Sequence, residues 1–180
     1  MLGIEVEYTM ERLTADNAKF IGGFNCGSDA IDLSEYLTEH ALDDNECVTY
    51  IFRTNTNKVI AYASLSCTAI VENLPGNSAL NKYIPSVLID KFAVDEEYHG
   101  LQYEDGNEEL TLSEVIFFRV LDEIYRISNE IIGAKYIVLY STNRAYHFYI
   151  KCGMGTFENE MRVPNDPYID ECTPLCIGPI

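Results

Sequence analysis

The sequence lacks the features that direct a protein into a membrane or out of the cell. No stretch approaches the ~18 consecutive apolar residues of a membrane-spanning helix. Residues 1–7 have neither the basic region nor the apolar core of a signal peptide. We therefore expect a cytoplasmic protein that does not associate with membranes.

Clusters of basic residues are also missing. The chain has 29 acidic and 12 basic residues, which give a formal net charge of −17. Such a charge repels phosphate backbones, whose binding depends on clustered Lys and Arg. We therefore expect nucleic acid to be an unlikely partner and a small amine or a basic peptide to be the substrate. The alternative is that the charge serves solubility alone.

The cysteines and histidines do not follow a metal-site pattern. Among the six cysteines, Cys172 and Cys176 are the one close pair, and neither a second pair nor a histidine accompanies them. His40 and His147 lie in expected helices without an acidic or thiol partner at ligand spacing. We expect no metal. Because the cytosol is reducing, we also favour free thiols over disulfides.

The chain is long enough for one hydrophobic core. It has 180 residues, of which 47% are hydrophobic, and it contains no repeat and no interdomain linker. We expect a single domain over residues 1–180. Residues 164–180 contain four prolines and little periodicity, so we expect an irregular surface tail there.

Hydrophobic periodicity predicts alternating strands and helices. Thr111-Leu-Ser-Glu114 has the pattern of a capping box, in which the first and fourth residues of a helix start bond to each other. An apolar strand, a long helix and a second apolar strand follow one another between residues 87 and 140, which predicts two parallel strands with a ligand crevice at their carboxyl ends. Helices are expected over residues 14–21, 28–42, 111–132 and 143–152, and strands over 4–8, 47–53, 59–71, 86–94, 136–140 and part of 155–163.

The segment after the second of these strands has the most specific motif. It reads Ala145-Tyr-His-Phe-Tyr149-Ile-Lys-Cys-Gly153-Met154 and resembles the Ala-x-x-Phe-Tyr-x-x-x-Gly-Phe signature of the GNAT superfamily of N-acetyltransferases. The resemblance extends over about residues 45–160. It implies an α/β (α+β) GNAT fold, with a mixed central sheet of about six to seven strands, flanking helices, and splayed parallel strands 4 and 5.

The resemblance also implies acetyl-CoA as co-substrate and assigns roles to individual residues. Tyr149 would protonate the leaving sulfur, although an ordinary core aromatic is the alternative. Strand backbone would pair with the pantetheine amides, a loop and a helix start would hold the phosphates, and a second helix start would contact the cofactor. The strand residues would be Phe92, Ala93 and Val94. The phosphate-binding residues would be His99 and Gly100 in the loop and Thr111, Leu112 and Ser113 at the helix start. The residues at the second helix start would be Asn143 and Tyr146.

One segment departs from the family pattern. About ten extra residues separate Gly100 from the helix start, and they include Glu104, Asp105, Glu108 and Glu109. Acidic groups near a helix N-terminus compete with phosphates for the same N–H groups and repel them. The segment therefore weakens the expectation that CoA binds.

Three functions remain open. The first is an N-acetyltransferase that acts on a primary amine of a small molecule or a basic peptide. The second is a GNAT-fold protein that has lost CoA binding and acts as an interaction module. The third is a toxin-type acetyltransferase acting on aminoacyl-tRNA, because Phe24-Asn-Cys26-Gly27 and the following helix resemble toxin-type GNAT proteins. The oligomeric state is open, with a homodimer as one possibility.

Overall fold

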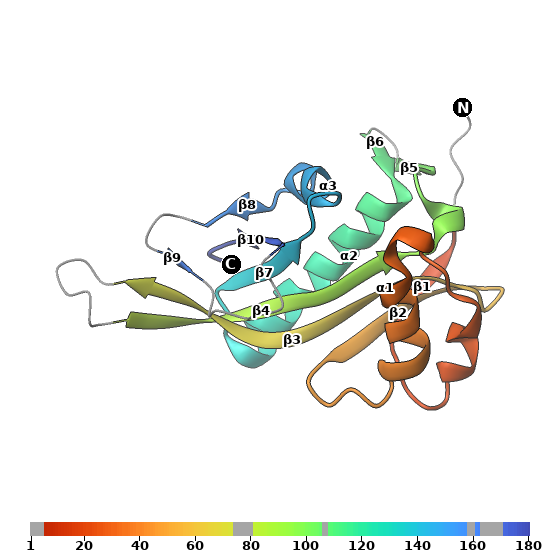
Figure 1. The fold of residues 1–180 in the computed structure, drawn as a ribbon, viewed down its shortest axis with the longest axis horizontal. Coiled ribbons are helices and arrows are strands. Elements are labelled where there is room, and N and C mark those ends of the chain that lie inside the picture. The colour runs from red at the N-terminus through yellow and green to blue at the C-terminus, as the bar shows by residue number, and fades with distance from the viewer. Residues whose placement is uncertain (1–5, 74–80, 106–107, 158–160, 163–170) are drawn as a thin grey trace. The chain divides into compact units, whose positions relative to one another are not determined.

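The computed structural model describes residues 6–73, 81–105, 108–157, 161–162 and 171–180 (Figure 1). Within these ranges, no helix combines the length and the apolar character that crossing a membrane requires. The structure describes only residues 6–8 of the expected first strand, and the strand observed there is Tyr8–Arg12. The prolines and Gly76 also predict a loop over residues 72–85, but its described ends belong to the strands Val59–Asn73 and Asn81–Val94.

The fold is built on a mixed β-sheet. Seven strands follow one another in the order β1-β2-β3-β4-β7-β10-β8, and β9 pairs with β3 beside this path. The expected mixed sheet with flanking helices is confirmed. The strands are β1 (Tyr8–Arg12), β2 (Val48–Thr54), β3 (Val59–Asn73), β4 (Asn81–Val94), β7 (Tyr136–Ser141), β8 (Gly155–Thr156), β9 (Met161–Arg162) and β10 (Thr173–Ile177).

Strands β4 and β7 are the parallel pair that the sequence predicts. Ser86–Ile89 of β4 pair with Tyr136–Leu139 of β7. Beyond this pairing β4 continues to Val94, and β7 continues to Ser141. The second strand of the pair is seventh in chain order, not fifth, because a hairpin of two further strands lies between the two.

Backbone contacts divide the chain into two units. The first comprises Met1–Leu65 and Asp90–Val120, and the second comprises Ser66–Ile89 and Leu121–Ile180. Strands β3 and β4 and helix α2 (Leu112–Ile127) contribute residues to both units. The single domain over residues 1–180 stays a prediction.

In the first unit, short helices cover one face of the sheet. Tyr62 of β3 lies between the rings of Phe24 and Tyr36, with centroid distances of 5.4 and 6.1 Å, and Ala93 of β4 belongs to the same core. The neighbouring side chain, Phe92, points the other way and packs on Phe117 of α2 at 5.1 Å. The helices are η1 (Ala18–Gly23), η2 (Ser28–Ala30), α1 (Ile31–Glu35) and η3 (Tyr36–His40), so the continuous helix expected over 28–42 is in fact a 3-10, an α and a π segment.

The second unit has a core of its own around Ile70, Ile84 and Val138. After α2, the π-helical segment η5 (Ser128–Ile132) ends at Gly133, whose φ of 65° is the left-handed conformation that favours glycine. Helix α3 (Tyr146–Lys151) follows β7, as expected.

The expectation of an irregular tail is wrong for the end of the chain. Thr173–Ile177 form β10, which pairs antiparallel with β7, and Leu175 is fully buried. Backbone pairing in the sheet outweighs the local effect of Pro174. Residues 164–170 of the expected tail lie outside the described residues.

Candidate functional site

The extra residues before α2 form a β-hairpin. The connection from β4 starts with a short 3-10 helix, η4 (Glu96–Tyr98), and continues through Gly100. Strands β5 (Gln102–Asp105) and β6 (Glu108–Thr111) then pair in register from Gln102↔Thr111 to Asp105↔Glu108, and β6 leads directly into α2 (Figure 1). We had not predicted this hairpin, although Asp105-Gly106 is a strong hairpin signal in a sequence.

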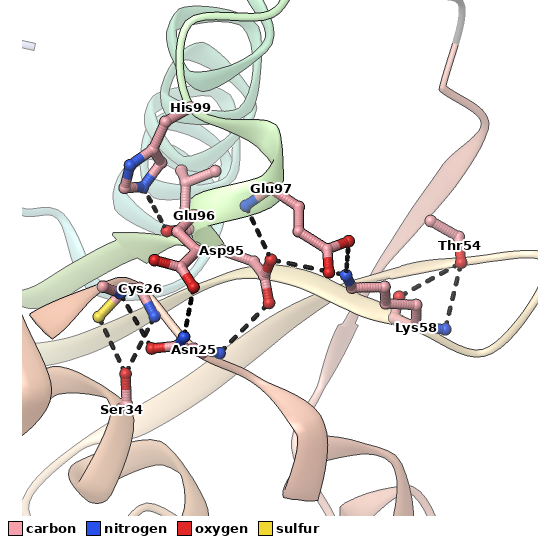
Figure 2. A network of polar contacts seen from close by, with 11 residues as sticks. Asn25, Cys26, Ser34, Thr54, Lys58, Asp95, Glu96, Glu97 and His99 are labelled. Atoms are coloured by element: carbon pink, nitrogen blue, oxygen red, sulfur yellow. Dashed lines mark hydrogen bonds and ion pairs between the residues drawn. The ribbon is translucent and has the colours of Figure 1, made fainter.

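Asp95 is the buried anchor of this connection (Figure 2). Only 2% of the residue is exposed. Its carboxylate accepts hydrogen bonds from the backbone N–H groups of Asn25 and Glu97, each at 3.2 Å, and lies 3.6 Å from Nζ of Lys58. A buried carboxylate with these partners fixes the loop rather than reacting.

Neighbouring contacts fasten the same loop to Asn25. The Glu96 N–H donates to the Asn25 carbonyl at 2.8 Å, and the Asn25 side-chain amide donates to the Glu96 carboxylate at 2.6 Å. Lys58 also forms an ion pair with Glu97 (Figure 2). This network could not be predicted from local sequence patterns, because Asn25 and Asp95 are 70 residues apart.

His99 and Gly100 lie at the surface, just after η4. The Nε2 atom of His99 is 2.7 Å from the Val94 carbonyl oxygen, so that Nε2 carries the proton and donates it. Gly100 has a φ of 69°, which a residue with a side chain rarely adopts. In this arrangement the Nε2–H group of His99 is directed at a carbonyl oxygen of the chain itself rather than at a phosphate.

The end of β4 suits only part of its predicted role. The N–H of Asp95 donates to the Ile60 carbonyl of β3 at 2.8 Å. Since backbone polar groups alternate in direction along a strand, those of Ala93 also face β3, whereas those of Phe92 and Val94 face away from it. Pairing with a pantetheine arm therefore fits Phe92 and Val94, with the Val94 carbonyl shared by His99.

The start of α2 forms the predicted capping box. Oε2 of Glu114 accepts hydrogen bonds from the Thr111 N–H at 2.7 Å and the Thr111 hydroxyl at 3.0 Å, and the Glu114 N–H lies 3.3 Å from that hydroxyl. The Leu112 N–H donates to the Leu101 carbonyl at 2.9 Å. Of the three residues expected to hold phosphates here, only Ser113 lacks such a bond among the described residues, so the helix start fits a phosphate poorly.

Helix α3 places Tyr149 inside the second unit. The residue is 9% exposed, and its ring packs edge-on against Phe148 at 5.2 Å. Burial, and to a lesser degree the nearby Cys152, raises the pKa of the Tyr149 phenol far above its ordinary value. The phenol therefore keeps its proton at neutral pH, as a general acid must, although burial also suits a core aromatic.

The two other residues expected at this helix are more accessible. Tyr146 is half-buried, and its ring meets that of His147 at 5.6 Å. Asn143 is exposed in the short connection between β7 and α3. Both can reach a ligand at the surface of the second unit.

A hollow of about 1040 Å³ lies elsewhere in the first unit, and none of the predicted site residues lines it. Its walls come from β1, the end of β2, β5 and α2. The lining residues include Tyr8, Met10, Tyr103, Val115 and Arg119.

No family model matches the chain, and no curated protein matches it. Solved structures do. AtaT complexed with acetyl-methionyl-tRNAfMet is 22% identical, with a TM-score of 0.68 over 96% of this chain and 95% of AtaT. AtaTR bound with acetyl-CoA is 20% identical, with a TM-score of 0.69 over 95% and 93%. A tyrosine-to-phenylalanine mutant of KacT is 19% identical, with a TM-score of 0.67 over 95% and 94%.

The chain has the GNAT fold. The matches cover almost the whole length of this chain and of each matched chain. Strands β4 and β7 are parallel neighbours in the order of the sheet. The fold and the distant likeness to toxin-type GNAT proteins that the sequence predicts are thus confirmed.

The same comparisons overturn our expectation about partners. Two structures of AtaT, which has this fold, contain nucleic acid: one is complexed with acetyl-methionyl-tRNAfMet, and the other is the AtaT–AtaR complex with DNA, at 22% identity and a TM-score of 0.63. Our expectation that nucleic acid is an unlikely partner, and that the substrate is a small amine or a basic peptide, was wrong. The net charge misled us because it sums over the whole surface, whereas binding depends on a local region.

Proposed function

We propose that the chain is an acetyltransferase that uses acetyl-CoA and acetylates the amino group of an aminoacyl-tRNA. One observation carries this proposal: the structure of AtaT with acetyl-methionyl-tRNAfMet superposes over 96% of this chain. The acetyl-CoA complex of AtaTR, which covers 95% of it, supports the choice of acyl donor.

Acetyl transfer requires a proton for the departing sulfur. Bound acetyl-CoA supplies a thioester carbonyl. The amine nitrogen forms a bond to the acyl carbon and loses one proton, the carbon–sulfur bond breaks, and the thiolate takes up a proton. Tyr149 can supply that proton at its phenolic oxygen, because the phenol is protonated at neutral pH.

Backbone groups of β4 are proposed to bind the pantetheine arm. Phe92 and Val94 present their N–H and C=O groups on the side away from β3, as a strand does toward a paired partner. Asn143 and Tyr146, which are exposed and half-buried, are proposed as further contacts to the donor.

The test is an acetylation assay on aminoacyl-tRNA. Purified protein, acetyl-CoA and a mixture of charged tRNAs are incubated, and N-acetylated aminoacyl-adenosine is detected by mass spectrometry after nuclease digestion. Tyr149→Phe should lower the rate roughly 10²–10³-fold, as expected for loss of a general acid. Tyr83→Phe, which removes a phenol from a residue that is 66% exposed, is the control and should keep the wild-type rate. No acetylated product from any charged tRNA would refute the proposal.

The second candidate is a GNAT-fold protein without CoA binding that acts as an interaction module. Its support is the start of α2, where the Thr111 and Leu112 N–H groups already have partners within the chain. Calorimetric titration with acetyl-CoA separates the two candidates. No heat change and no thermal stabilisation at millimolar acetyl-CoA would favour the interaction module.

A further inference from the structure

The start of α2 is an anion-binding position that the chain fills with its own carboxylate. Helix N-termini attract anions because their first N–H groups lack partners within the helix. Here Glu114, which is 2% exposed, accepts two hydrogen bonds from Thr111, and the Leu101 carbonyl takes the Leu112 N–H. A phosphate would have to displace a buried, doubly hydrogen-bonded carboxylate.

The sequence around this position adds to the repulsion. Glu104, Asp105, Glu108 and Glu109 belong to the hairpin that leads into α2. Lys58, in the turn between β2 and β3, forms ion pairs with Asp95 and Glu97 of this connection. A phosphate at this helix start would therefore meet the negative charge of the Glu114 carboxylate.

The pantetheine arm of CoA requires different binding groups from those that hold the phosphates. It is uncharged and carries two amides, which pair with strand backbone rather than with a helix start. The backbone of Phe92 and Val94 faces away from β3 and is separate from the capping box. Recognition of the arm and recognition of the phosphates thus depend on different residues of the chain.

We propose that the chain recognises its acyl donor through the pantetheine arm and the thioester, and that the adenosine diphosphate part of CoA contributes little. This inference rests on the acetyltransferase function proposed above. The donor class is then acyl-pantetheine thioesters in general, whether free, phosphorylated or attached to a carrier protein. The bonds made and broken are the same for each: an amide forms, a thioester breaks, and the amine proton ends on the thiol.

The decisive measurement compares donors on one aminoacyl-tRNA. S-acetylpantetheine, S-acetyl-4′-phosphopantetheine, an acetylated carrier protein and acetyl-CoA are assayed for kcat/KM. We expect S-acetylpantetheine to fall within about tenfold of acetyl-CoA, a difference of ~1.4 kcal/mol. Adenosine 3′,5′-bisphosphate should not inhibit at millimolar concentration. A preference for acetyl-CoA of about a thousandfold, or inhibition by micromolar bisphosphate, would overturn the inference and leave the acetyltransferase function intact.

A charge variant provides a second, independent measurement. Glu114→Gln keeps the shape of the side chain and removes its charge, so it should raise the affinity for CoA several-fold and leave that for pantetheine unchanged. Glu130→Gln removes the same charge from an exposed position of η5 and should change neither affinity. Equal affinity changes for CoA and pantetheine in Glu114→Gln would contradict the inference. If no donor binds or reacts with the wild-type protein, the inference and the proposed function both fail.

Discussion

The two connections that follow the parallel strands β4 and β7 are built in opposite ways. After β4 the chain makes a long connection, with a 3-10 turn, a hairpin and a capping box, before α2 begins. After β7 only residues 142–145 precede α3. The first connection uses its polar groups internally, through Asp95, His99, Thr111 and Glu114. The second leaves Asn143 exposed and ends at a helix with one buried phenol.

This difference shows that one of the two connections can change while the other keeps its length and its buried tyrosine. The short connection keeps the family spacing from Ala145 to Gly153, and the buried position of Tyr149 comes with it. The long connection keeps the helix start but fills it with Glu114. A group that donates one proton and a site that holds phosphates can therefore diverge separately in one fold.

The largest difference between the two connections is expected when Asp95 is removed. Asp95→Ala should lower the free energy of unfolding by roughly 2–3 kcal/mol, because two backbone N–H groups and Lys58 lose a buried acceptor. Asn143→Ala, in the other connection, should cost no more than about 0.5 kcal/mol because the residue is exposed. Urea unfolding measures both. Equal losses would show that the two connections do not differ as described.

Alkaline pH tests the second connection. Burial raises the pKa of Tyr149 above its ordinary 10.0, so the unfolded chain loses this proton first as pH rises. The stabilisation is complete below pH 10 and is lost as pH rises further toward the pKa in the folded state. Between pH 10 and 11, the unfolding free energy of the wild type should fall more steeply than that of Tyr149→Phe, by about 1 kcal/mol per pH unit.

The exposed Tyr83 provides the control for that experiment. Tyr83→Phe removes a phenol from a residue that is 66% exposed, so it is the matched control for the loss of a buried phenol. Buried Tyr62 also has its pKa raised by burial and adds to the slope of every variant alike. If Tyr149→Phe and Tyr83→Phe have the same slope, Tyr149 is not buried in solution.

The smallest expected effects are those of substituting the threonines that precede α2 and α3. Thr111→Ala should lower the free energy of unfolding by about 1 kcal/mol, because the Thr111 hydroxyl contacts both the N–H and the carboxylate of Glu114. Thr142→Ala should cost only a few tenths, because its exposed hydroxyl lies 3.4 Å from the Ala145 N–H. Thermal melting measures both. A larger shift for Thr142→Ala would reverse the assignment of the stronger cap.

The parts of the fold that depend on local pattern could be predicted from the sequence. The capping box at Thr111 and Glu114, the helix stop at Gly133 and the apolar strand around Val138 all rest on residues close in sequence. The hairpin had a local signal in Asp105-Gly106 as well, but its strands are acidic and alternate weakly.

Other features depend on distant partners and could not be predicted. Strand β10 contains Pro174, which argues against a strand until β7 is known to lie beside it. The role of Asp95 becomes visible only when its hydrogen-bond donor Asn25 is known to lie beside it. The Leu112 N–H is unavailable to a ligand because it donates to the Leu101 carbonyl, and this contact depends on the path of the hairpin. Type and spacing predicted the candidate residues, whereas their availability to a ligand depends on tertiary contacts.

The capping box has a consequence for how the molecule folds. Thr111 and Glu114 are three residues apart, and Leu101 and Leu112 differ by eleven positions, whereas Asn25 and Asp95 are separated by 70. Short loops cost less entropy to close than long ones and close sooner. We therefore expect the start of α2 to be complete early in folding, before the distant loop is fastened. Any ligand that arrives later meets a helix end whose hydrogen bonds were made while the rest of the chain was still assembling.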